Sequence, residues 1–188
     1  HQRLDERATA RTRAAGPVAR SVPVTARSET EMVAGRDWLA ALRRYFAFTA
    51  VAHLIWEFAH LPLYTIWLTG TTGELVFAAV HCTGGDILIA LSAVMLSLFL
   101  FGKGAWPAER RIPVVAGAVV FGLVYTIFSE WLNIEIREAW AYRDLMPVIP
   151  VLGAGLSPVL QWIVVPLTGF SLARVLPTVR RSQGTVNV

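Results

Sequence analysis

Cysteine and charge are the two scarce components of this sequence. A single cysteine, Cys82, occurs in 188 residues, which excludes a framework of disulfides within the chain and a cluster of thiolate metal ligands. Charged residues make up 16% of the chain, whereas soluble domains usually carry about 25%. The deficit of charged residues favours lipid over water as the main surroundings of the protein.

Long apolar runs fill most of the chain. They cover residues 45–69, 74–101, 112–134 and 151–175. Each is long enough for a helix that crosses the hydrocarbon layer, which takes about 20 residues. We therefore predict an all-α fold, a transmembrane four-helix bundle in residues 37–178, followed by a short tail at 179–188. The lipid bilayer is the expected partner, and a homo-oligomer or a larger membrane complex remains open.

Basic residues predict how the spans are oriented. They precede the first run, separate the second from the third, and follow the fourth: Arg36, Arg43, Arg44; Lys103, Arg110, Arg111; Arg174, Arg180, Arg181. All three groups lie on one side of a membrane if the chain crosses it four times. Because basic residues favour the cytoplasmic side, both termini are then predicted to be cytoplasmic. Because the positive charge is explained as a topology signal, the formal net charge of +4 does not argue for a nucleic-acid partner.

The N-terminal segment differs from the rest of the chain. Residues 1–44 contain nine arginines and five acids and show no apolar periodicity before Trp38. Such a composition cannot bury enough apolar surface to order a fold by itself. We expect residues 1–36 to be a disordered basic tail, or an extension upstream of the membrane domain.

Three ionisable residues interrupt the first apolar run. His53, Glu57 and His60 are spaced i, i+4 and i+7, so a helix places them on one face. An ionisable group at membrane depth is costly, and it indicates a functional site or an obligate pair. Glu57 and His60 also form one Glu-x-x-His pattern, which occurs twice in carboxylate-bridged metal sites of helical bundles. Only one copy is present here.

The other runs carry polar residues at similar estimated depth, in the outer half of the membrane. These residues are His81 and Asp86, Glu130, and Gln161, on the second, third and fourth runs. Their agreement in depth predicts one buried His/Glu/Asp centre. His81 and Asp86 are about 140° apart on a helix at 100° per residue, so both reach the centre only if they flank the contact line or if Gly84 and Gly85 distort the helix.

A metal site acting on a lipid-soluble substrate is the first interpretation of this centre. Imidazole and carboxylate groups are ligands of zinc, iron and manganese. The predicted ligands are Glu57, His60, His81, Asp86 and Glu130, and the residues expected around them are Tyr64, Asn133, Gln161 and Arg137. The alternatives are a small proton-coupled carrier or channel, a structural subunit of a membrane complex, and a haem held by His60 and His81. Whether the protein is an enzyme, which residues would be catalytic and which metal binds all stay open.

Some of these residues also have simpler structural interpretations. We expect His53 to be a neutral, hydrogen-bonded histidine of the core. Glu130 is as well explained by an ion pair with Arg137 as by metal ligation. Cys82 is expected to be packing only, because a buried thiol away from positive charge stays protonated.

Two short strings resemble a known family. WEFAHLPLY at 56–64 and HCTGGD at 81–86 are similar to strings in small bacterial integral membrane proteins with four helices. The resemblance covers the facing parts of the first two spans. It implies a multi-pass protein of the bacterial inner (cytoplasmic) membrane, and it implies no activity. The residues that carry it are Trp56, Glu57, Pro62, Tyr64, His81, Cys82, Gly85 and Asp86.

Overall fold

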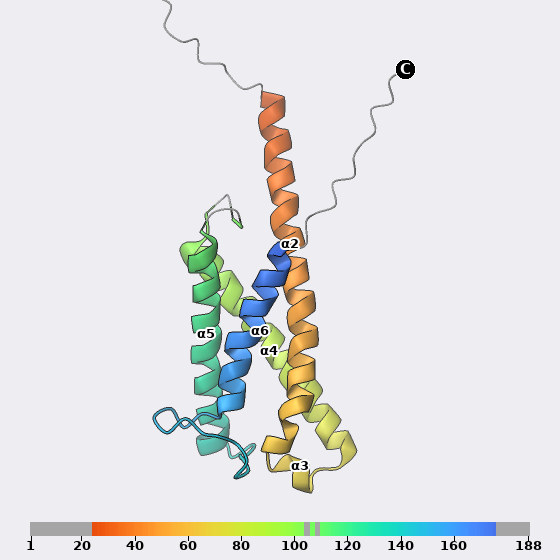
Figure 1. The fold of residues 1–188 in the computed structure, drawn as a ribbon, viewed down its shortest axis with the longest axis vertical. Coiled ribbons are helices and arrows are strands. Elements are labelled where there is room, and N and C mark those ends of the chain that lie inside the picture. The colour runs from red at the N-terminus through yellow and green to blue at the C-terminus, as the bar shows by residue number, and fades with distance from the viewer. Residues whose placement is uncertain (1–23, 104–105, 108–109, 176–188) are drawn as a thin grey trace, which may run out of the picture. The chain divides into compact units, whose positions relative to one another are not determined.

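The computed structural model describes residues 24–103, 106–107 and 110–175, and all its regular elements are helical (Figure 1). In chain order they are α2 (Val24–His60), the 3-10 turn η1 (Leu61–Leu63), α3 (Ile66–Thr69), α4 (Thr72–Phe101), α5 (Arg111–Trp131), the π-helical turn η2 (Leu132–Ile136) and α6 (Leu156–Val175). No strand occurs in these residues, so the predicted all-α class is confirmed there.

Four helical segments are long and apolar enough to cross a membrane. They are Trp38–Leu63, Thr72–Phe101, Arg111–Ile136 and Leu156–Ala173. Large apolar side chains on them point outward, for example Phe99, which is 84% exposed, and Ile112, which is 82% exposed. An apolar exterior of this kind is suited to lipid. The prediction of a multi-pass membrane protein is confirmed at this level, while its orientation stays a prediction.

The chain divides into two compact units, residues 1–35 and 36–188. In the first unit, residues 24–35 are helical and belong to α2. Regular structure therefore begins earlier than the sequence predicted, in a stretch rich in good helix formers such as alanine, arginine, glutamate and methionine. Residues 1–23 of the expected tail, and the expected tail at 179–188, lie outside the described residues.

Within the second unit, α5 packs against both α4 and α6. In Figure 1, α6 lies between α5 and α2, and α4 crosses behind it. A glycine lets α5 and α6 approach each other closely, because a Cβ atom added at Gly122 of α5 would lie 2.2 Å from the ring of Trp162 on α6. Tyr45 of α2 stacks on Phe170 of α6 with ring centroids 4.1 Å apart. These contacts set the spacing of the helices around the polar interior.

Proline ends the first spanning helix. Pro62 cannot donate an intrahelical hydrogen bond, and α2 gives way there to η1 and then to the separate short helix α3. The outer end of the first span is therefore interrupted. Helix α4 then begins at a capping box, in which Thr71 and Glu74 each satisfy the backbone N–H of the other.

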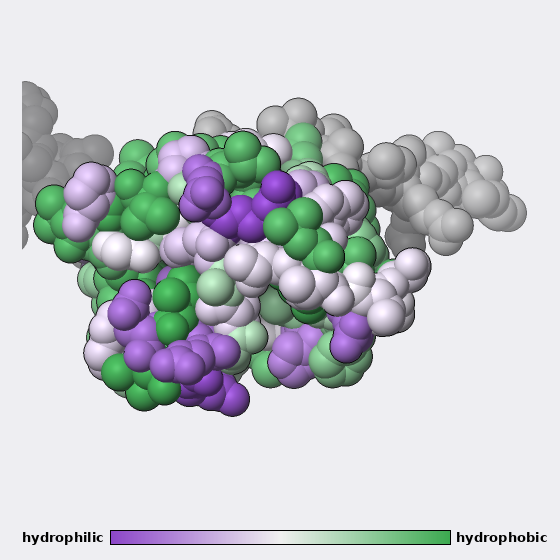
Figure 2. All heavy atoms as spheres, turned by 90° about the horizontal axis from the view of Figure 1, so that it is seen from below, coloured by the Kyte–Doolittle hydropathy of each residue, from purple (hydrophilic) through white to green (hydrophobic). Residues whose placement is uncertain are grey.

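The long connection between η2 and α6 folds back onto this break. The N–H of Thr65 donates to the carbonyl of Ala141 (2.9 Å), and the N–H of Arg143 donates to the carbonyl of Leu63 (2.9 Å). The guanidinium of Arg143 also donates to the carbonyl of Pro62 (2.6 Å). We call residues 139–155 the return loop. Seen from this end, hydrophilic side chains gather in several groups separated by apolar ones (Figure 2).

Helix α6 begins at Leu156, five residues later than the sequence predicted. Gly153 has φ +64°, which is a turn conformation open to glycine. The N–H of Leu156 donates to the carbonyl of Pro147 (2.7 Å). The apolar residues 151–155 therefore belong to the return loop.

Candidate functional site

One face of α2 is polar and buried over the length of the span. Five of its side chains, spaced three or four residues apart, and Tyr64 just beyond η1 are at most 9% exposed: Tyr45, Thr49, His53, Glu57, His60 and Tyr64. This spacing follows the 3.6-residue period of the helix, as the sequence predicted for the outer part of this face. We call these six residues the polar seam.

Gln161 of α6 joins the polar seam to α4. Its Nε2 atom lies 2.8 Å from Nδ1 of His53, 3.0 Å from Oε1 of Glu57 and 3.1 Å from Oδ2 of Asp86. Nδ1 of His53 is also 3.1 Å from Oδ2 of Asp86. Gln161 is 2% exposed and His53 is fully buried. Three helices thus meet in one hydrogen-bonded cluster.

The hydrogens of this cluster can be arranged in two ways. The amide nitrogen of Gln161 has two hydrogens but three neighbouring groups. In one arrangement, His53 is an imidazolium whose Nδ1–H donates to the Asp86 carboxylate, and the Gln161 amide donates to the two carboxyl groups. In the other, the same proton is on Asp86, which donates it to Nδ1 of the neutral His53, and the amide still donates to the two carboxyl groups. The two states differ by one proton crossing a contact of 3.1 Å.

His60 connects the same carboxyl group to α6. Its Nε2 lies 3.0 Å from Oε2 of Glu57, and its Nδ1 lies 3.1 Å from Oγ of Ser157. The indole N–H of Trp56 donates to Ser157 Oγ at 3.2 Å. Since indole is a donor only, Ser157 accepts from Trp56 and keeps its own hydrogen for His60. In the tautomer of His60 that carries its hydrogen on Nε2, Nδ1 accepts from Ser157 and Nε2 donates to Glu57.

Glu130 forms a second polar group, at the return loop. Its Oε2 accepts from the hydroxyl of Tyr142, which itself accepts from the N–H of Gly155 at 2.8 Å. Tyr64 lies beside both groups, with its ring 5.5 Å from that of Tyr142 and 5.2 Å from that of His60. Burial and the adjacent Glu130 carboxyl raise the pKa of the Tyr142 phenol, so this phenol remains a hydrogen donor.

His81 lies outside this assembly, contrary to the expected convergence. Its side chain is exposed on α4 and stacks on Phe77, with ring centroids 5.4 Å apart. Helix α4 runs without interruption through Gly84 and Gly85, so the 140° between His81 and Asp86 is preserved. With Asp86 turned inward, His81 faces the exterior. A haem held by both His60 and His81 does not match this placement.

Two other expected neighbours are also placed elsewhere. Asn133 is buried but donates to the carbonyl of Ser129 (2.8 Å), and its amide oxygen accepts from Arg137 (3.2 Å). Arg137 is exposed. The ion pair considered for Glu130 is replaced by the hydrogen bond from Tyr142. Gln161, in contrast, contacts Glu57 and Asp86, and the ring of Tyr64 lies against that of His60.

The predicted metal ligands are only partly brought together. Glu57 and His60 are in contact, and Asp86 is joined to Glu57 through Gln161. Among the residues that the structure describes, no three His, Cys, Asp or Glu side chains are grouped so that they could hold a metal ion. Metal binding by this set stays a prediction.

The sequence indicated only part of this assembly. His53 is a buried, hydrogen-bonded histidine of the core, as expected, but its partners Gln161 and Asp86 were not predicted. Ser157 and Tyr142 were not among the residues expected at the centre. Each acquires its partner from a distant segment, so spacing along the chain carried little signal.

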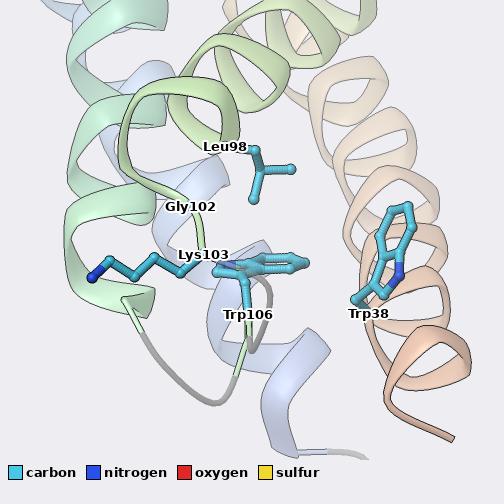
Figure 3. Close-up of a pocket in the computed structure, with 5 residues that line it drawn as sticks. All are labelled: Trp38, Leu98, Gly102, Lys103 and Trp106. Atoms are coloured by element: carbon cyan, nitrogen blue, oxygen red, sulfur yellow. The ribbon is translucent and has the colours of Figure 1, made fainter. Parts of the chain in front are cut away.

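A groove of about 350 Å³ lies at the other end of the spans. It is lined by Trp38, Leu98, Gly102, Lys103 and Trp106. Figure 3 shows Trp106 extending toward Trp38, while the ammonium of Lys103 points away from Trp38. Trp38 precedes His60 by 22 residues on α2, or about 33 Å of helix at 1.5 Å per residue. The groove is therefore separate from the cluster.

Comparisons with known proteins give no family assignment. No protein-family model, no curated protein and no solved structure matches this chain.

Proposed function

We propose that this protein is an integral membrane enzyme that performs general acid–base chemistry on a lipid-soluble substrate. The observation that carries the proposal is the set of contacts at Gln161 Nε2, which holds His53, Glu57 and Asp86 within 3.1 Å of one atom. A proton can move between His53 and Asp86 with little change in geometry. A site with both an acid and a base within hydrogen-bond reach is what general acid–base catalysis requires.

The surroundings of the cluster support a lipid-soluble substrate. Glu57 and Asp86 have imidazole groups as their partners, those of His60 and His53. The cluster lies inside the spanning segments, where ionisable side chains normally serve a function because they are expensive to bury. A substrate that reaches such a cluster from the bilayer has to dissolve in it.

A search for the substrate tests this proposal without knowing its identity. The purified full-length protein is placed in nanodiscs made from a total bacterial lipid extract in D2O, and the lipids are analysed by mass spectrometry. We expect at least one lipid-soluble molecule to be consumed or to gain deuterium. The change should be lost in Glu57→Gln and Asp86→Asn and kept in Glu135→Gln, which alters an exposed acid. No change dependent on Glu57 and Asp86 would refute the proposal.

A metal-dependent form of the same enzyme would show itself in elemental analysis. Zinc, iron or manganese bound stoichiometrically to the wild type, and lost from Glu57→Gln and His60→Gln, would assign a metal role to the predicted ligands. Absence of stoichiometric metal in active protein would remove the metal from the proposal and leave acid–base chemistry.

A proton-coupled carrier or channel is the second candidate, and the polar seam favours it. The seam places hydroxyl, imidazole and carboxyl groups along α2 and just past its end, from Tyr45 to Tyr64, and such a series can pass protons. Liposomes that contain the protein and a pH-sensitive dye distinguish the two cases. Proton flux that is abolished by His53→Gln would favour the carrier or channel. Absence of proton flux in liposomes that contain the wild-type protein would exclude it.

The location of the protein belongs to the same proposal. The distribution of basic residues supports cytoplasmic termini. The strings at 56–64 and 81–86 support membership of a family of small bacterial four-helix membrane proteins, and hence the bacterial inner membrane.

A further inference from the structure

We infer that Ser157 is a nucleophile, activated by His60 and Glu57, and that the lipid-soluble substrate is a fatty acyl ester. The inference rests on the proposed function and names its substrate class. The geometry that carries it is a line of three groups: Ser157 Oγ is 3.1 Å from Nδ1 of His60, and Nε2 of His60 is 3.0 Å from Glu57. A nucleophile bonded to a base that a third group orients is the general arrangement of nucleophilic catalysis.

The direction of the hydrogen bonds suits an attack by the hydroxyl. Trp56 N–H donates to Ser157 Oγ, which leaves the serine hydrogen available to Nδ1 of His60 at 3.1 Å. The carboxylate of Glu57 accepts from Nε2 of His60 and holds the imidazole in the tautomer whose free lone pair faces the serine. His60 is therefore set as a base toward Ser157, and Glu57 stabilises the imidazolium that forms when the proton arrives.

The depth of Ser157 matches that of lipid ester groups. Ser157 is the second residue of α6, and this helix has 20 residues, a length of about 30 Å, equal to the thickness of the hydrocarbon layer. His60 lies three residues before the end of the first spanning segment at Leu63. Both side chains thus lie at one edge of the hydrocarbon layer, where the ester carbonyls of membrane lipids are found.

The side chain of Ser157 is also more exposed than those of the cluster at Gln161. Ser157 and Trp56 are half-buried, whereas Glu57 and His60 are buried. The apolar residues Ile55 on α2 and Leu160 on α6 are exposed nearby, so an acyl chain in the bilayer can lie against both helices. The site is thus accessible from lipid.

The reaction needs only the ester and water. Ser157 Oγ forms a bond to the carbonyl carbon, its proton passes to Nδ1 of His60, and the carbonyl π electrons move to oxygen, beside the Trp56 N–H. When they return, the bond to the alcohol breaks, and His60 gives its proton to the departing oxygen. Water then attacks the acyl serine, with His60 again the base, and releases the fatty acid and Ser157. His53 and Asp86 hold Glu57 through Gln161.

An active-site-directed probe tests the nucleophile directly. Wild-type protein in phosphatidylcholine and phosphatidylglycerol nanodiscs is treated with a long-chain alkyl fluorophosphonate, and the adduct is located by peptide mass spectrometry. We expect an adduct at Ser157 and none at Ser97, a buried serine bonded to the carbonyl of Ala93. The labelling rate should fall about 100-fold or more in His60→Gln, as loss of a general base does. In H2 18O, the released fatty acid should carry one 18O.

Two results would overturn the inference. One is folded wild-type protein that forms no adduct at Ser157, and the other is an adduct whose rate is unchanged in His60→Gln. Both are obtained without altering Ser157, so a folding defect at that residue cannot obscure them. Ser157→Ala, where it folds, separates this inference from the proposed function: substrate consumption that depends on Glu57 and Asp86 but not on Ser157 would refute the nucleophile and leave the acid–base enzyme standing.

Discussion

Gln161 and His53 are 108 residues apart in the chain, and their side chains meet at 2.8 Å. This contact joins α6 to α2, and the same amide nitrogen contacts Asp86 of α4. One side chain therefore links three spanning helices at a buried point. Removing it should disturb both the packing and the chemistry of the cluster.

Replacement of Gln161 by leucine tests that link. The change keeps the approximate size of the side chain but removes the hydrogens that serve His53, Glu57 and Asp86, and a buried group left without its partner costs about 1–3 kcal/mol. We expect a lower midpoint of thermal unfolding in detergent. In a double-mutant cycle with Asp86→Asn, the two losses should deviate from additivity by about 0.5–3 kcal/mol. Strict additivity would mean that the two side chains do not interact.

Asp86 and His81 should differ sharply in their importance, although the sequence placed both in the centre. Asp86→Asn removes an acid that contacts His53 and Gln161, and we expect it to abolish substrate consumption in nanodiscs. His81→Gln alters an exposed ring stacked on Phe77 and should leave consumption within about twofold of the wild type, as surface substitutions usually have small effects. Equal losses in the two variants would contradict the placement of His81.

Tyr142 should make the protein sensitive to alkali. Its pKa in the folded protein is raised, whereas in the unfolded chain it is about 10. Above about pH 10 the unfolded state therefore loses this proton while the folded state keeps it, and stability falls as pH rises. The test compares thermal unfolding at about pH 9 and about pH 11, one unit on either side of the ordinary pKa of a phenol. Over this range the unfolding midpoint of Tyr142→Phe should decrease less than that of the wild type. Parallel curves would refute the assignment.

Gly122 and Gly84 form a matched pair for packing. An added Cβ would lie 2.2 Å from Trp162 at Gly122 but would meet nothing within 4 Å at Gly84. Since overpacking costs about 1–3 kcal/mol, Gly122→Ala should lower the unfolding midpoint. Gly84→Ala should leave it unchanged or raise it, because alanine favours helix over glycine. The reverse order would show that α5 and α6 are not in contact at Gly122.

The orientation of the spans can be checked with single cysteines. In a Cys82→Ser background, Lys103→Cys and Asp144→Cys place thiols at exposed positions on opposite sides of the second and third spans. An impermeant maleimide added to intact bacterial cells should label Asp144→Cys and spare Lys103→Cys, which should react only after lysis. Labelling of Lys103→Cys alone would invert the predicted topology.

The order in which apolar and polar residues follow one another was enough to predict the helical class and the number of spans. Both depend on a local property, because a run of apolar residues has to be long enough to cross lipid. The polar face of α2 was also predictable, because His53, Glu57 and His60 lie on one helix at fixed angles. The same helical geometry predicted that the side chains of His81 and Asp86 point in different directions.

The partners of that face were decided only by the tertiary structure. Sequence spacing determines the angle of a side chain around its own helix, but it contains no information about the rotation of one helix against another. That rotation depends on contacts such as Gly122 with Trp162 and Tyr45 with Phe170. It turned Asp86 inward and His81 outward, brought Ser157 to His60, and placed Tyr142 of the return loop on Glu130. The sequence determined which groups could react, and packing determined which of them meet.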